Sequence, residues 1–91
     1  MKDAVNDTVV LDKLSSRLSK LTEQMNAATQ RLQLEFEKAS QVLEGESFND
    51  VRRHVENAVV ATDEICSEIK EAQRYLSDLK KTITEYERLK F

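Results

Sequence analysis

The most restrictive feature of this sequence is the spacing of its apolar residues, which alternates between three and four positions over most of the chain. Such a heptad repeat is typical of a seam between α-helices that wind around each other. The chain has no proline and one glycine, Gly45, so little in it would interrupt a long helix. In the first half, the repeat is carried by Leu11, Leu14, Leu18, Leu21, Met25, Ala28 and Leu32.

This first-half repeat slips once. After Leu32 it resumes at Phe36, Ala39 and Leu43, so a step of four replaces a step of three. A stutter of this kind locally unwinds a supercoil, and a hairpin can simply tolerate it. Alternatively, the slip marks a change of packing partner along the helix. The second half carries an unbroken repeat, made of Phe48, Val51, Val55, Ala58, Thr62, Ile65, Ile69, Ala72, Leu76, Leu79, Ile83 and Tyr86.

Gly45 and Ser47 predict a tight turn between the two repeats. Glycine at a helix C-terminus adopts a left-handed conformation without a Cβ penalty. Ser47 fits the N-cap of a following helix, and Asp50 stands three residues later, as in a capping box. A connection this short makes the helices antiparallel neighbours. We therefore expect an all-α fold, a single domain over residues 1–91, with helices at about 8–44 and 47–90 and with Asp7 or Thr8 capping the first.

Two helices alone form only a narrow seam, and so small a core is marginal without oligomerisation or a partner. Association is also favoured by apolar residues outside the repeat, such as Leu34, Val42, Val59, Val60 and Leu89. We expect a four-helix or larger helical bundle, built from a homodimer or with a helical protein partner. The residues expected in the seam or in the partner interface are Phe36, Leu43, Phe48, Val51, Val55, Ile65, Ile69, Leu76, Leu79, Ile83 and Tyr86.

Reactive side chains are too scattered to predict an enzyme. His54 and Cys66 are the obvious base and nucleophile, but twelve residues along one helix separate their backbones by roughly 18 Å. We expect His54 to pair with Asp50 on the helix surface, and Cys66 to serve as a small hydrophobic residue that is buried or half-buried.

No cofactor or metal site is predicted either. The acidic residues of the second half lack the glycine-bearing loop of a calcium site and the Glu-x-x-His pattern of a di-iron bundle, so a solvated acidic face is expected. The acidic residues concerned are Asp63, Glu64, Glu68 and Glu71. The sequence also contains no glycine-rich phosphate loop.

Charge and hydropathy exclude further classes. The net charge of −3 does not suit a nucleic-acid binder, and no apolar run reaches the length of a membrane span. The first seven residues lack the apolar stretch of a general secretion signal, so we expect a cytoplasmic protein. Residues 46–71 hold seven acids and three bases, whereas residues 72–91 hold five bases and three acids. This asymmetry either complements the helix dipole or sets the orientation of a docked helix.

The whole layout resembles the small WXG-type, Esx-like proteins of type VII secretion. The likeness is greatest to the divergent helical proteins that accompany LXG toxins. Such proteins form helical hairpins with a Trp-x-Gly turn near mid-chain, and Leu43-Glu44-Gly45 stands at that place here. The resemblance implies a non-catalytic targeting factor or chaperone that binds the N-terminal domain of an exported LXG-type toxin, or a sister hairpin protein.

Two departures qualify what the resemblance implies. Leu43 replaces the tryptophan of the turn. The family's export signal, an aromatic residue followed four positions later by an acid, is incomplete, because Leu79 follows Tyr75 and Lys90 follows Tyr86 at that distance. This favours a subunit that is exported with its partner, or that remains behind. The alternative from the repeat alone is a cytoplasmic coiled-coil adaptor or structural assembly protein unrelated to secretion.

Overall fold

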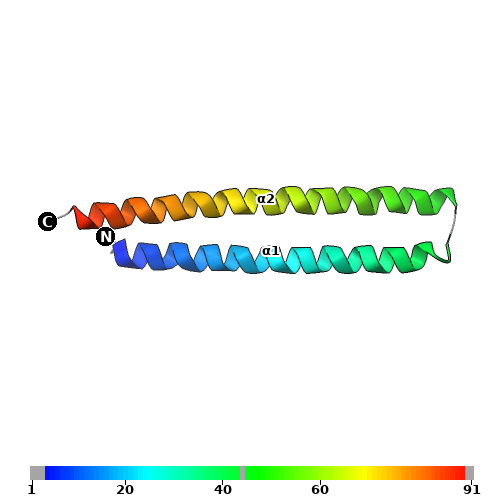
Figure 1. Ribbon diagram of the computed structural model, residues 1–91, viewed down its shortest axis with the longest axis horizontal. Coiled ribbons are helices and arrows are strands. Elements are labelled where there is room, and N and C mark those ends of the chain that lie inside the picture. Colours follow the sequence, from blue (N-terminus) through cyan, green and yellow to red (C-terminus); the bar gives the residue numbers. More distant parts are fainter. Residues whose placement is uncertain (1–3, 44, 90–91) are drawn as a thin grey trace.

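The protein is an antiparallel hairpin of two long α-helices, as the repeats predict. The computed structural model describes residues 4–43 and 45–89. Helix α1 spans Ala4–Ser40 and helix α2 spans Glu46–Arg88. The two helices lie side by side along their length, with the turn at one end of the rod and the start of α1 near the end of α2 at the other (Figure 1). The rod measures 71 × 17 × 15 Å.

The first helix ends four residues before the predicted boundary. The backbone amides of Val42 and Leu43 both donate to the carbonyl of Ala39, at 3.2 and 3.0 Å, and so close its last turn. The Ser40 hydroxyl donates to the Glu37 carbonyl at 2.7 Å. Because these bonds satisfy carbonyls that a helix end leaves free, the chain can leave α1 at Ser40.

Gly45 is the N-cap of α2, and not the left-handed residue that closes the C-terminus of the first helix, as was expected. Its φ of 127° and ψ of 172° lie in a region that only glycine adopts readily, and its carbonyl accepts the Asn49 amide at 3.1 Å. The prediction of Ser47 as N-cap is wrong, because α2 already begins at Glu46. The predicted caps of the first helix are also wrong, because α1 begins at Ala4 and both Asp7 and Thr8 lie within it.

Only one of the two alternating columns of each apolar repeat faces the other helix. The half-buried column consists of Leu11, Leu18 and Met25 of α1, and of Phe48, Val55, Thr62, Ile69, Leu76 and Ile83 of α2. The second inward column is largely polar, with Ser15, Thr22 and Thr29 on α1, and Val59, Cys66, Gln73, Lys80 and Glu87 on α2. Cys66, at 7% exposure, is the one buried residue of the described chain, so the hairpin has a thin core.

The turn predicts opposite responses at two neighbouring positions. A Cβ at Gly45 would meet no atom within 4 Å, so Gly45→Ala strains the backbone alone. We expect this change to lower the free energy of unfolding by about 1–3 kcal/mol. Ser47→Ala, inside the helix, should be neutral or slightly stabilising, whereas loss of a true serine cap costs about 1 kcal/mol. Chemical denaturation of both variants checks this, and equal losses would contradict the assignment of the cap.

Candidate helix-docking face

The side chains that could carry chemistry do not converge. His54 is exposed, and the expected pair with Asp50 does not form, because Asp50 accepts from Arg53 at 3.1 Å instead. Cys66 is buried as predicted, with its Sγ 3.7 Å from Asn26 Oδ1. Within residues 4–43 and 45–89, no three His, Cys, Asp or Glu side chains are placed to hold a metal ion. No helix in the same ranges is long and apolar enough to cross a bilayer.

One edge of the seam is polar, with contacts repeated at heptad spacing. Asp12, Ser19 and Asn26 of α1 each contact a side chain on α2. Gln73 Nε2 donates to the Ser19 hydroxyl at 2.8 Å and to the Ser15 carbonyl at 2.9 Å. We call these contacts the polar edge; they pair Asp12 with Lys80, Ser19 with Gln73, and Asn26 with Cys66.

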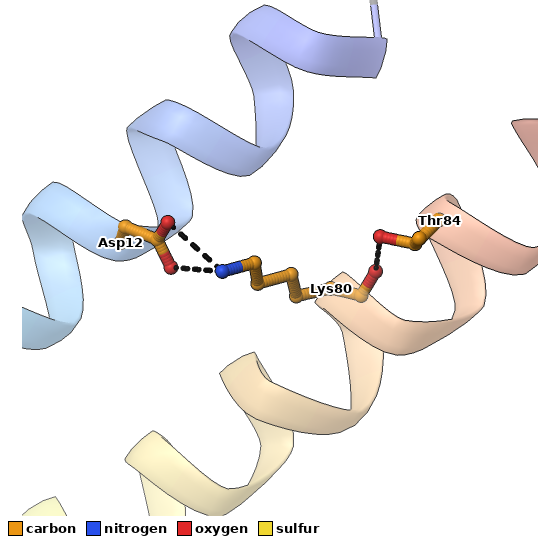
Figure 2. Close-up of polar contacts among 3 residues, drawn as sticks. All are labelled: Asp12, Lys80 and Thr84. Atoms are coloured by element: carbon orange, nitrogen blue, oxygen red, sulfur yellow. Dashed lines mark hydrogen bonds and ion pairs between the residues drawn. The ribbon is translucent and has the colours of Figure 1, made fainter.

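Figure 2 shows the end of the polar edge that lies farthest from the turn. The Lys80 ammonium donates to both carboxylate oxygens of Asp12 at 3.0 Å, and the Thr84 hydroxyl donates to the Lys80 backbone carbonyl at 2.9 Å. Both charged side chains are about half exposed, so this ion pair contributes little stability, about 0.2–1 kcal/mol. The main effect of the ion pair is on the register of the hairpin, because it favours one alignment of the residues that lie opposite each other on the two helices.

The other column of the predicted repeat lies on the surface. Each member except Val51, which precedes the exposed Arg52, stands one position before an inward residue, as Leu14 does before Ser15. The larger side chains in this column are 45–67% exposed. We call this column the open face; it consists of Leu14, Leu21 and Ala28 of α1, and of Val51, Ala58, Ile65, Ala72, Leu79 and Tyr86 of α2.

The two halves of the open face share one side of the hairpin. Antiparallel helices are related by a two-fold axis perpendicular to their common plane, which keeps residues at the same heptad position on the same side. Open-face residues other than Val51 precede an inward residue, whereas Asp12, Ser19 and Asn26 of the polar edge all follow one. The open face therefore lies opposite the polar edge and spans both helices. On α2 it includes a shallow hollow between Glu64 and Glu68, lined by Ile65, Ile69 and Ala72.

Near the turn, the apolar residues change direction. Phe36 stacks on Phe48 with ring centroids 4.9 Å apart, and the Arg52 guanidinium lies 5.5 Å from the Phe36 ring centre. Phe36 occupies the inward column that Ser15, Thr22 and Thr29 occupy earlier in α1. The slip after Leu32 thus coincides with a move of apolar side chains from the open face into the seam. The second interpretation of the stutter, a change of packing partner, stays a prediction, because the contacts of the described residues all lie within the hairpin.

The predicted interface residues are therefore divided between two surfaces. Phe36, Phe48, Val55, Ile69, Leu76 and Ile83 face the other helix, and Val51, Ile65, Leu79 and Tyr86 lie on the open face. Leu43 lies in the turn and is 53% exposed. Sequence reasoning missed the polar edge, although its members recur at intervals of seven on both helices. That recurrence was the available signal.

No protein-family model matches the chain, and no curated protein or solved structure is significantly similar to it. The resemblance to type VII secretion proteins therefore depends on the hairpin and on the position of its turn.

The stacked rings predict that Phe48 stabilises the hairpin itself. Phe48 is half-buried, so Phe48→Ala should cost less than the roughly 3–5 kcal/mol of a fully buried phenylalanine, and should still lower the melting temperature clearly. Val42→Ala is the control, since Val42 is apolar, close to the turn and 80% exposed. Circular dichroism during heating distinguishes the two. Unchanged melting of Phe48→Ala would contradict the internal role.

The polar edge predicts a specific role for one glutamine. Gln73→Ala removes the hydrogen bonds to Ser15 and Ser19 and should cost about 1 kcal/mol in the free energy of unfolding. Gln30→Ala is the matched control, because Gln30 is exposed and alanine suits a helix at least as well as glutamine. Denaturant titration measures both. Equal stability of the two variants would show that the polar edge contributes nothing at this position.

Proposed function

We propose that this chain is a non-catalytic helix-binding protein whose open face docks helices of another chain. The observation that carries the proposal is the gathering of apolar side chains from both helices on one exposed side. Large contiguous apolar patches on soluble proteins usually mark interaction sites. Helices in a globular bundle bury a stripe three columns wide, and this hairpin covers only part of such a stripe by itself.

We further propose that the partner is the helical N-terminal domain of an LXG-type toxin, and that the chain is its targeting factor or chaperone in type VII secretion. The resemblance of the hairpin and its central turn supports this identity. The incomplete aromatic-to-acid signal favours a subunit that depends on its partner for export, or that stays in the cytoplasm. A cytoplasmic coiled-coil adaptor would use the same face for a long helix of another protein.

Co-expression with the N-terminal domain of an LXG toxin from the same genome tests the proposal. Leu14→Ser, Leu21→Ser and Leu79→Ser, introduced together, should reduce co-purification of the toxin domain by at least about tenfold, because apolar anchors dominate such interfaces. The matched control carries Val9→Ser, Leu34→Ser and Val60→Ser, three apolar residues of similar exposure outside the open face.

The two triple variants separate the possible outcomes. Full capture by the control and loss of capture by the open-face variant support the proposal. Equal capture by both would refute the open face as the docking surface. A wild-type chain that ignores the toxin domain would refute the secretion role and leave the adaptor as the better account.

A further inference from the structure

We infer that the open face of the isolated protein is covered by a second copy of the chain, docked with both turns at the same end. In the resulting four-helix bundle, α1 of each copy lies against α2 of the other. The inference rests on the proposed function in one respect, that the open face binds helices. It adds the identity of the occupant and the direction in which that occupant lies.

The rotation of the apolar stripe favours a four-helix arrangement. In each helix, the stripe formed by the half-buried column and the open face is centred about 50° away from the direction of the neighbouring helix, at 100° per residue. A two-helix coiled coil would centre this stripe on the seam. In a square bundle the common core lies roughly 45° from each neighbour, close to the rotation found here. Both helices are turned in the same sense, toward the open face.

The size of the open face suits a stable dimer. It extends from Leu14 to Ala28 on α1 and from Val51 to Tyr86 on α2, with the half-buried column beside it. At 1.5 Å per residue, the open face is about 21 Å long on α1 and about 52 Å long on α2, and each helix is about 10 Å wide. Summed over the two helices, the area is about 700 Å² per copy, close to the area of about 800 Å² that a standard stable interface buries on each partner.

Charge selects the occupant and its direction. On each helix, two further heptad columns lie next to the open face, on the side turned away from the neighbouring helix, and we call them the outer border. On α1, the outer border contains all five basic residues of the helix and no acid. These bases are Lys13, Arg17, Lys20, Arg31 and Lys38. Of these five bases, only Lys38 has an ion-pair partner among the described residues; the partner is Glu35, which stands three positions before it on the same helix.

The outer border of α2 has the opposite charge. The same two columns contain six acids and no lysine or arginine, namely Asp50, Glu64, Glu68, Glu71, Asp78 and Glu85. Asp50 and Glu71 pair with arginines of their own helix. The other four acids have no ion pair within the part of the chain that the structure describes.

These borders make the surface complementary to a copy of itself in one direction. With both turns at the same end, the basic border of α1 meets the acidic border of α2 along both sides of the dimer. With the turns at opposite ends, α1 would face α1 and α2 would face α2, placing like charges together at every border. Like-charge contacts destabilise an interface, so the first arrangement is selected.

A charge reversal on α1 tests the selection. The variant Lys13→Glu, Lys20→Glu and Arg31→Glu should dissociate at least about tenfold more readily than wild type in sedimentation equilibrium, since its outer borders are then both acidic. The control, Arg74→Glu, Lys81→Glu and Arg88→Glu, changes the net charge equally but lies outside these borders, and should stay dimeric. Mixing the α1 variant with Glu64→Lys, Glu68→Lys and Glu85→Lys should restore a dimer. A variant that dimerises as tightly as wild type overturns the inference.

Spin labels test the direction independently of charge. The labelled chain carries Val42→Cys in the turn and Cys66→Ala, with circular dichroism used to confirm that it remains helical. With both turns at one end, the labels should lie less than about 30 Å apart, because neighbouring helix axes are about 10 Å apart. Turns at opposite ends would separate the labels by nearly the 71 Å length of the rod and overturn the inference.

The oligomeric state separates this inference from the proposed function. An isolated chain that stays monomeric at high micromolar concentration, yet captures the toxin domain, overturns the inference and leaves the function standing. A dimeric chain whose toxin capture is unaffected by the open-face serines overturns the function and leaves the inference standing.

Discussion

The polar edge is the constraint on which the rest of the structure depends. Its contacts recur every seven residues, from Asp12–Lys80 through Ser19–Gln73 to Asn26–Cys66, and they fix both the register and the rotation of the two helices. Each contact is individually weak. Together they hold polar side chains in one column of the seam, and geometry then requires that an apolar column of each helix face outward. The hairpin thus leaves part of its apolar surface exposed, on the side where we propose that another chain binds.

This arrangement accounts for the exposure of the molecule as a whole. One residue of the described chain, Cys66, is buried, although 40% of the sequence is hydrophobic. The turn end differs, because there the stacked Phe36 and Phe48 place their apolar surface inside the hairpin. The two helices are therefore packed against each other by an aromatic pair next to the turn, and along the remainder they expose an apolar surface suited to partner helices.

Much of the fold could be predicted from the sequence, because heptad spacing and the lack of helix-breaking residues determine two long helices and an antiparallel hairpin. The ends of the helices could not, because Gly45 serves either as the end of one helix or as the N-cap of the next, and backbone hydrogen bonds decide between them. The repeat also could not predict which apolar column of each helix faces the other helix. The apolar repeat of α2 occupies two columns, so Leu79 and Leu76 were equally good candidates for the seam, and the rotation depends on contacts such as that between Gln73 and Ser19 across the hairpin.

The central claim is that Leu14, Leu21 and Leu79 face outward while Leu11, Leu18 and Leu76 face the other helix. Methyl NMR with a soluble paramagnetic probe measures this directly, because the probe broadens exposed methyl groups. In dilute, dissociated protein, the first three leucines should broaden and the second three should be protected; at high concentration, where a second copy covers the open face, the first three should become protected as well. Equal protection of all six leucines at every concentration would contradict the account.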